Sequence, residues 1–232
     1  MMRIEEQIEK INELITKERA EKFAAFQALL LEYNGKFNLT SIIDEREIFY
    51  KHFLDSGIGE FLFEPFKKGC EVGSGAGFPS IPLKILRDDL ALDLFESVGK
   101  KCEFLRVVVD KLGFSNMNIY NIRAEDAARK EEFREKYDFC TARAVARMNS
   151  LSEYCLPLVK KGGVFIAYKS GDLSEIDEAE SAYKALGGKK RQTYSYSLPE
   201  NMGERTLAVI EKIKNTPPKY PRGQGKERKN PL

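Results

Sequence analysis

The sequence contains a single histidine among its 232 residues, and this scarcity limits the chemistry that the chain can perform. A hydrolase built on a Ser-His-Asp triad and a metal site built on several histidines both need more imidazole groups than His52 supplies. We therefore expect neither, and no bound metal. His52 lies in the segment YKHFLDS, ahead of the first expected strand, where a structural role as a cap or local hydrogen-bonding partner is favoured.

Cysteines are few, and their spacing excludes the usual cysteine-based sites. The chain has four, and neighbouring ones lie 32, 38 and 15 positions apart. This spacing fits neither a zinc knuckle, nor a Cys-x-x-Cys pair, nor the disulfide framework of a small secreted domain. We expect reduced and mostly buried thiols at Cys70, Cys102, Cys140 and Cys155.

Long apolar runs are also missing. No stretch approaches the ~18 apolar residues that a membrane-spanning helix requires, and the N-terminus is charged every few positions. We expect a soluble, cytoplasmic protein without a membrane partner. A chain of 232 residues suits one α/β domain with an appendage, and it can bury a full core without disulfides or metals.

Positive charge is unevenly distributed along the chain. The segment 212–232 contains seven Lys and Arg residues against one Glu, so it carries +6 while the remainder carries −4. Its prolines and glycines predict that the tail over 215–232 forms no regular element. Two interpretations stay open: a disordered, solubilising terminus, or a flexible arm whose cations neutralise the phosphates of a nucleic acid.

Helical periodicity dominates the first part of the chain. Apolar residues recur at three- and four-residue steps through 3–33, and the pattern returns over 44–63 with Asp44 as a candidate N-cap. We expect an N-terminal helical extension over residues 1–66.

The pattern then alternates between strand-like and helical stretches. Expected strands are 69–72, 91–96, 117–122, 137–142 and 163–169, and expected helices are 78–87, 98–112, 124–134, 148–160 and 172–186. Such βα repeats predict a parallel, doubly wound sheet. Two successive strand-like runs, 189–199 and 204–214, then predict a terminal antiparallel hairpin. Over 67–214 this is the order of the Rossmann-like class I methyltransferase fold, an α/β fold with a mostly parallel seven-stranded sheet.

The segment EVGSGAGFP, residues 71–79, places Gly73, Gly75 and Gly77 directly after the first expected strand. Open α/β sheets bind ligands at this edge, and glycine permits positive φ and the close approach of a flat ligand. Phe78 stands where the dinucleotide fingerprint has its third glycine, and no Gly-Lys-Ser/Thr follows. We therefore expect a ligand without phosphates, such as S-adenosylmethionine. A tight turn without a ligand is the alternative.

Acidic residues follow the next two strands. Glu96 ends the second strand, about 20 residues after the glycines, where a carboxylate can accept hydrogen bonds from both ribose hydroxyls of a bound nucleoside. Ala124 and Glu125 follow the third strand and suit an adenine, through a small residue against the ring and a polar contact to its amine. The alternatives are a surface glutamate and an ordinary helix start.

Nine blocks, taken in chain order, resemble a known family. They are YNGKFNLTSI, HFLDS, VGSGAGFPSIPLKI, FESVGKKCEFLRVV, RAE, TARAVARMNSLSEYCLPLVKKGG, AYKSG, GERTLAVI and NTPPKYPR. From Tyr33 to the C-terminus the chain is similar to the bacterial guanine-N7 methyltransferases of 16S ribosomal RNA, the RsmG or GidB family. Ser80 and Glu96 replace the glycine and aspartate of many members, and neither change removes a required chemical group.

The resemblance implies roles for particular side chains. It implies cofactor contact at Gly73, Phe78, Ala124, Glu125 and Arg143, with Glu96 as the ribose partner. It also implies that basic residues around the pocket hold RNA or the target base. These are Arg123, Arg143, Lys169 and Arg205. Of them Arg143, Lys169 and Arg205 are the candidate catalytic residues.

The implied reaction needs little acid–base chemistry. Methyl transfer from a sulfonium is an in-line displacement, and guanine N7 already has a free lone pair, so alignment matters and a general base is dispensable. The [DNS]-P-P-[YFW] motif of amine methyltransferases does not follow the fourth strand. Carbon-5 methylation needs a cysteine nucleophile, but Cys140 lies within that strand, where a buried structural thiol is favoured.

Basic residues outside the pocket are candidates for RNA contact. A cation near guanine O6 or the phosphates is the arrangement that N7 methylation allows. The candidates for RNA binding are Lys100, Lys101, Arg123, Arg147 and Arg222. For Lys100 and Lys101 a solvated helix face is the alternative.

Other functions stay open on the residues alone. The acceptor could be another RNA or a small molecule, and the same fold could serve a nucleotide-binding regulator without catalysis. The expected partner is 16S ribosomal RNA or the small ribosomal subunit, and the expected state is a monomer.

Overall fold

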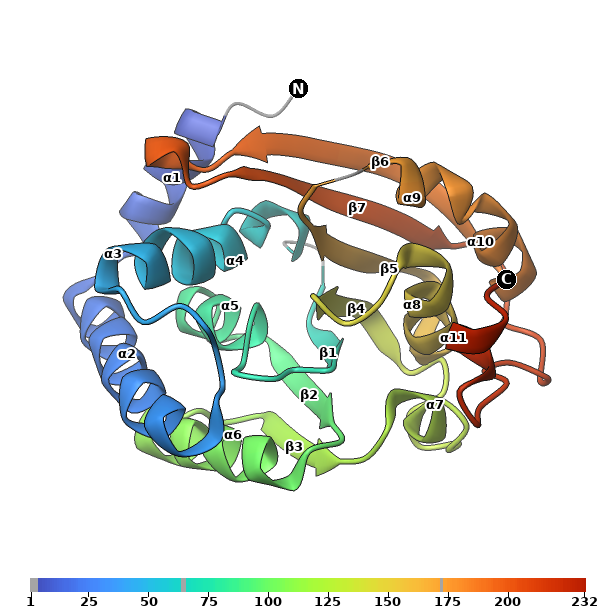
Figure 1. Cartoon of the computed structure of the whole chain (residues 1–232), viewed down its shortest axis with the longest axis horizontal. Coiled ribbons are helices and arrows are strands. Elements are labelled where there is room, and N and C mark those ends of the chain that lie inside the picture. Colours follow the sequence, from blue (N-terminus) through green and yellow to red (C-terminus); the bar gives the residue numbers. More distant parts are fainter. Residues whose placement is uncertain (1–3, 64–65, 172) are drawn as a thin grey trace.

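A seven-stranded sheet forms the centre of the computed structural model, which describes residues 4–63, 66–171 and 173–232 (Figure 1). The strands are β1 (Lys68–Val72), β2 (Ala91–Glu96), β3 (Met117–Asn121), β4 (Tyr137–Arg143), β5 (Val159–Lys169), β6 (Gly188–Ser197) and β7 (Glu204–Lys212). They lie in the order β3-β2-β1-β4-β5-β7-β6.

The sheet is parallel except at one end. β3, β2, β1, β4 and β5 run in the same direction, whereas β7 is antiparallel to both β5 and β6. The predicted α/β fold with a mostly parallel sheet and a terminal hairpin is therefore confirmed. The strand order reverses between β1 and β4, and open α/β sheets bind ligands at the carboxyl edge beside such a switch point.

Helices surround the sheet. Before it come α1 (Ile4–Leu14), α2 (Lys17–Phe37), α3 (Glu45–Ile48), the π-helix η1 (Phe49–Leu54), α4 (Asp55–Gly57) and the 3-10 turn η2 (Glu60–Phe63). The other helices lie between the strands in chain order or follow the last strand. They are α5 (Ser80–Leu86), α6 (Gly99–Lys111), α7 (Ala124–Ala127), α8 (Met148–Cys155), the 3-10 turn η3 (Leu156–Leu158), α9 (Ser174–Glu178), α10 (Glu180–Leu186), the 3-10 turn η4 (Pro199–Asn201) and α11 (Lys226–Lys229).

Each face of the sheet is covered by its own set of helices, which Figure 1 shows on opposite sides of the strands. The apolar core of one face takes side chains from α1, α2, α5 and α6, and that of the other face takes them from α7, α8, α9 and α10. The N-terminal extension shares the first core, since Phe26 of α2 lies 5.3 Å from the Phe78 ring, centroid to centroid. The extension thus packs directly beside the glycine turn.

Local chemistry explains where the helices begin and end. Asp44 accepts a hydrogen bond from the Glu47 backbone N–H at 2.9 Å, as expected of the predicted N-cap. The predicted helix over 124–134 is wrong beyond Ala127: only α7 is regular, and the chain continues in turns. Arg134 in these turns donates to carbonyls of the C-terminal tail, contacts that lie far along the sequence and that periodicity does not reveal.

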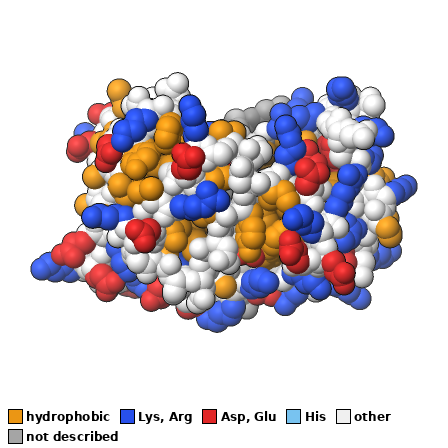
Figure 2. Space-filling view, turned by 90° about the horizontal axis from the view of Figure 1, so that it is seen from below, with side chains coloured by type: hydrophobic (Ala, Val, Ile, Leu, Met, Phe, Trp, Pro, Cys, Tyr) orange, Lys and Arg blue, Asp and Glu red, His pale blue; other side chains and the backbone are white. Residues whose placement is uncertain are grey.

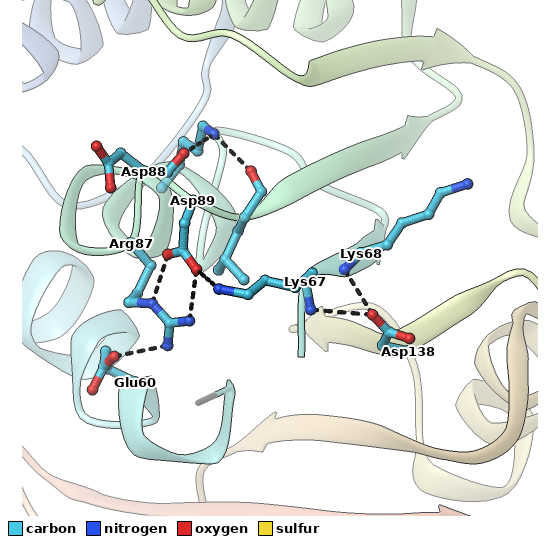
Figure 3. A network of polar contacts seen from close by, with 9 residues as sticks. Glu60, Lys67, Lys68, Arg87, Asp88, Asp89 and Asp138 are labelled. Atoms are coloured by element: carbon cyan, nitrogen blue, oxygen red, sulfur yellow. Dashed lines mark hydrogen bonds and ion pairs between the residues drawn. The ribbon is translucent and has the colours of Figure 1, made fainter. Parts of the chain in front are cut away.

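The amino edge of the sheet, opposite the expected ligand edge, is tied together by polar contacts (Figure 3). The Asp138 carboxylate accepts from the backbone N–H groups of Lys67 and Lys68 at 3.1 and 2.8 Å, joining β4 to the start of β1. Arg87 pairs with both Asp89 and Glu60, joining α5 to η2. These contacts fix the entry of β1, so the glycine turn at its other end has a defined position.

The C-terminal tail is ordered, which corrects the expectation that it forms no regular element. It contains the short helix α11, and Tyr220 is buried. Arg129 donates to the carbonyl groups of Pro221 and Arg222, and Lys212, fully buried, donates to the Thr216 hydroxyl at 2.8 Å. Composition predicts disorder, but cations of the folded domain donate hydrogen bonds to carbonyl and hydroxyl groups of the tail.

The surface carries both signs of charge. Figure 2 shows Lys and Arg side chains interspersed with Asp and Glu around patches of apolar side chains on the face seen from below. This face therefore lacks the single-sign field that steers a polyanion. In the part of the chain that the structure describes, no helix combines the length and the apolar character needed to cross a membrane.

Candidate functional site

The glycine turn after β1 has the backbone conformation that its residues predict. Gly73 and Gly77 have φ of +67° and +91°, and a Cβ would lie 2.7 Å from a Val145 methyl at the first position and 2.5 Å from Ile81 at the second. Both the conformation and the space therefore require glycine. Gly75, with φ of +56°, lines a cavity, and a Cβ there would make an ordinary van der Waals contact of 3.8 Å with the Gly73 carbonyl oxygen.

Two cavities meet at Gly73. The larger, of about 510 Å³, lies towards the helical extension, and the smaller, of about 310 Å³, lies towards β2 and the residues after β3. The buried Ser74 hydroxyl lines the larger cavity and has no hydrogen-bond partner among the described residues. Glycine backbone without side chains lets a flat ligand approach, and the unpaired hydroxyl can bond it. Both features fit a nucleoside ligand that carries no phosphate, such as S-adenosylmethionine.

The smaller cavity has the features expected of an adenosine pocket. Phe95, Ile122 and Ala124 give it apolar surface, and Glu125 and Arg123 supply polar groups. It thus contains the predicted pair Ala124 and Glu125.

Glu96 lies between the glycine turn and α6, with its carboxylate already engaged. Its Oε2 accepts from the Gly75 N–H at 2.9 Å, and its Oε1 accepts from the Val98 N–H at 2.8 Å. A carboxylate has about four acceptor sites, so two stay free for other donors such as hydroxyl groups. Glu96 therefore holds the turn in shape, and its predicted contact with a ribose stays a prediction.

One wall of the larger cavity is formed by three side chains in mutual contact. The His52 ring stacks on Phe78 with centroids 4.3 Å apart, and the Arg143 guanidinium lies 4.8 Å from the Phe78 centroid. Arg143 Nη2 lies 3.1 Å from His52 Nδ1, and His52 Nε2 lies 2.9 Å from Thr40 Oγ1. Because arginine only donates, Nδ1 must accept, and the Nε2–H donates to Thr40. His52 therefore joins distant segments and is not a local cap.

His52 is neutral at physiological pH. Burial, together with the charge of the neighbouring Arg143, lowers the pKa of His52 to about 3. A neutral imidazole keeps the flat stack with Phe78 and the acceptor for Arg143. This histidine therefore supplies shape to the cavity and no titration near pH 7.

Asp55 is the anchor for the cations of this cavity. Its carboxylate, 3% exposed, accepts from Arg143 at 3.0 Å and from the Tyr196 hydroxyl at 2.9 Å, and it lies 3.6 Å from Arg205 Nε. Asp55 thus connects the extension with β4, β6 and β7. The candidate catalytic residues Arg143 and Arg205 share this one carboxylate.

The larger cavity is positively charged. Its lining includes the five cations Lys51, Lys101, Arg143, Lys169 and Arg205 against the two carboxylates Asp55 and Glu175. Lys169 pairs with Glu175 at 3.1 Å and donates to the Ala146 carbonyl, so its charge is neutralised locally. The excess of cations favours a polyanionic partner at this opening.

The residues predicted for RNA binding have different surroundings. Lys101 lines the larger cavity, and Lys100 beside it lies 5.8 Å from the Phe37 ring. Arg123 is exposed at the rim of the smaller cavity, and Arg147 pairs with Glu178 at the surface.

Arg222 is not a free arm. Its guanidinium bonds both oxygens of the fully buried Glu153. Nη2 donates to Oε2 at 2.7 Å, and Nε donates to Oε1 at 3.0 Å. The flexible-arm interpretation of the tail is therefore wrong at this residue, because releasing Arg222 would leave a buried carboxylate unpaired.

The four cysteines are free and buried, as expected. Cys140 lies in the middle of β4, opposite Cys70 of β1, and is inaccessible to a substrate. In the described residues, no group of three or more His, Cys, Asp and Glu could hold a metal ion.

Glu71, just before the turn, predicts a pH dependence of stability. Burial raises its pKa to about 8, although the Ser80 hydrogen bonds and the Arg143 charge oppose this. Between its ordinary value of 4.5 and about 8 the folded carboxyl keeps a proton that the unfolded chain releases. The free energy of unfolding should therefore fall as pH rises through this window, by up to about 1.4 kcal/mol per pH unit.

The Glu71→Gln variant isolates this effect, since the amide has the same shape and does not titrate. Urea unfolding of both proteins from about pH 5 to about pH 9 should show wild type losing stability relative to Glu71→Gln. Parallel curves for the two proteins would contradict the buried, proton-holding carboxyl.

Sequence reasoning missed Thr40, His52, Ser74 and Asp55 as lining residues of the site. Thr40 lies in the block NLTSI, and His52 and Asp55 lie in HFLDS. Both blocks come before the sheet, so no strand-edge pattern marks them. The sequence signal that could have identified Thr40, His52 and Asp55 is that both blocks also carry the family resemblance.

Known proteins resemble this chain closely. A family model described as rRNA small subunit methyltransferase G matches residues 19–204. The chain is 45% identical over 231 residues to the ribosomal RNA small subunit methyltransferase G of Lactobacillus acidophilus, covering 97% of this chain and 96% of the relative. It is also 45% identical to that of Staphylococcus aureus, covering 98% and 96%.

Solved structures support the fold. The YcgJ protein from Bacillus subtilis matches with a TM-score of 0.52 at 13% identity, covering 72% of this chain and 100% of that chain. The family predicted from the sequence blocks is confirmed by the matches at 45% identity over nearly the full length. This chain belongs to the rRNA small subunit methyltransferase G, or GidB, family.

Proposed function

We propose that this chain transfers the methyl group of S-adenosylmethionine to N7 of a guanine in 16S ribosomal RNA. Its family makes it an S-adenosylmethionine-dependent ribosomal RNA methyltransferase. The observation that supports the site most directly is the pair of cavities that meet at Gly73, one adenosine-sized and one lined by excess positive charge. The cofactor would lie across both, with its adenosine in the smaller cavity.

The bound cofactor supplies an electrophilic methyl group on a sulfonium, and the protein supplies alignment. The glycine backbone at Gly73 and Gly75 allows close approach, and Glu96 fixes the turn through the Gly75 N–H. The Ser74 hydroxyl offers a hydrogen bond that no described residue takes.

The target guanine would enter the larger cavity beside the stacked rings of His52 and Phe78 and the adjoining Arg143 guanidinium. A flat wall of rings orients a base, and a base that leaves its helix is read by stacking. Arg143 is held by Asp55 and His52, so we assign it the positioning of this wall. Lys101, which has no side-chain partner among the described residues, and Arg205 are the better placed cations for the RNA backbone or O6.

No side chain needs to remove a proton, because N7 attacks with its own lone pair. The geometry agrees with this, since the one histidine is neutral and already bonded through both ring nitrogens. Catalysis would rest on positioning and on exclusion of water from the cavity.

Incorporation of tritiated methyl groups tests the proposal. The purified protein and labelled S-adenosylmethionine should label 16S RNA, or small subunits, from a strain that lacks the enzyme, and should not label RNA already methylated at the site. Cofactor binding without incorporation would overturn the reaction and favour a regulator. A labelled RNA that lacks N7-methylguanine would overturn the acceptor.

Two further properties belong to this proposal. A ribosomal substrate places the enzyme in the cytoplasm, where small subunits are assembled. The chain would also act as a monomer, and the sedimentation of the purified protein tests this.

A further inference from the structure

We propose that the C-terminal tail forms the outer wall of the cofactor's adenosine pocket and that Arg228 contacts the cofactor. The inference rests on the proposed function, because it takes the smaller cavity as the adenosine pocket. Gly225 and Arg228 line that cavity together with Phe95, Ala124 and Glu125. The tail therefore forms part of the cavity that the cofactor's adenosine is proposed to occupy.

The position of this wall is set by the fold. Arg134 donates to the carbonyls of Thr216 and Tyr220, at 2.8 and 2.9 Å, and so holds the first part of the tail against the residues after α7. Arg222 is clamped by Glu153 of α8. Because the first part of the tail and Arg222 are both held, the chain between 222 and 228 has little conformational freedom. This places Arg228 at the rim of the cavity.

The end of the tail is anchored as well. Glu227, fully buried, accepts from the Gly223 N–H, and the Ser150 hydroxyl of α8 donates to the Glu227 carbonyl at 2.7 Å. Gly225 has φ of +74° and turns the chain into α11. Arg228 follows directly after the buried Glu227, so its backbone is held while its side chain stays exposed.

The chemistry of Arg228 fits a nucleoside better than an anion. The ligand expected in this cavity carries no phosphate, and Val72, Phe95 and Ile122 give the lining apolar surface beside the polar Ser97, Arg123, Glu125 and Tyr154. A guanidinium can stack on an adenine and donate to its ring nitrogens or to ribose hydroxyls. Its Nη2 lies 3.4 Å from the Val145 carbonyl, a long hydrogen bond, and its side chain also bonds Tyr154, so part of its five N–H donors stays available.

Calorimetric titration with S-adenosylhomocysteine, in the absence of RNA, tests the inference. Arg228→Ala should weaken binding by roughly fivefold, the effect of losing one hydrogen bond or stacking contact. Lys229→Ala is the matched control, since Lys229 is the next exposed cation and does not line the cavity. It should bind like wild type.

A second variant, cut after residue 224, removes the wall entirely. It should lose binding by more than Arg228→Ala does, and circular dichroism will show whether it is folded. If it is unfolded, the Arg228→Ala result decides, since an exposed side chain can be removed without loss of the core.

The outcomes separate this inference from the proposed function. Wild-type affinity in Arg228→Ala overturns the inference, and a higher KM for RNA in that variant would then assign Arg228 to RNA. The proposed function would still stand if wild type methylates 16S RNA. Conversely, failure of wild type to methylate RNA overturns the function, while weakened S-adenosylhomocysteine binding in Arg228→Ala still supports the tail as a wall.

Discussion

Replacement of Asp55 by alanine is expected to destabilise the protein by about 3–5 kcal/mol, the cost of breaking a buried ion pair from one side. The loss leaves Arg143 without its counter-charge and the buried Tyr196 hydroxyl without its acceptor. Because whole domains are stable by only about 5–15 kcal/mol, the melting temperature should fall markedly. Methyl transfer should be abolished, since Arg143 then no longer supports Phe78 and His52.

Two further variants make this expectation specific. Asp55→Asn keeps an acceptor for Tyr196 but loses the charge, so it should fold better than Asp55→Ala and still transfer methyl groups at least about tenfold more slowly. Asp110→Ala, an exposed aspartate on α6, should behave like wild type. Urea unfolding and single-turnover assays check both. Wild-type stability and rate in Asp55→Ala would contradict the role of Asp55 as an anchor.

Replacement of Glu96 by alanine is expected to raise the dissociation constant for S-adenosylhomocysteine by roughly 100-fold. Its carboxylate holds the N–H groups of Gly75 and Val98, and each hydrogen bond to a charged group contributes about 1.5–3 kcal/mol. Without it the glycine turn loses its shape, and the proposed ribose acceptor disappears. Titration calorimetry measures the change.

Glu96→Asp separates the charge from the reach of this side chain. The shorter carboxylate keeps the charge and can bond one of the two N–H groups, so we expect binding within about tenfold of wild type. Glu103→Ala, on the exposed face of α6, is the control. If Glu96→Ala binds S-adenosylhomocysteine as tightly as wild type, the acidic residue at the end of β2 has no part in the site.

The sheet could be read from the sequence because its strands are short apolar runs between turn residues. β2 occupies 91–96 as predicted, and the terminal hairpin follows from two successive strand-like runs. The region after α7 could not be read this way. Its charged residues keep a helical appearance, but Arg134 bonds the distant carbonyl of Tyr220 instead of facing solvent.

The candidate site was predictable on one side only. The glycine turn, Glu96, Ala124 and Glu125 follow strands directly, so their place at the carboxyl edge comes from the βα order. The other side depends on pairs such as His52 with Arg143, which are 91 residues apart. Periodicity reports the neighbours of a residue along one element, and it carries no information on which elements meet across the sheet.

A crystal structure with bound S-adenosylhomocysteine tests the central claim most directly. We predict that the ligand spans both cavities, with its adenine between Ala124 and Arg228 and its sulfur near Gly73, facing the Phe78 side. Binding at any other place on the protein, or cavities that stay closed around Gly73 when the ligand is bound, would contradict the account.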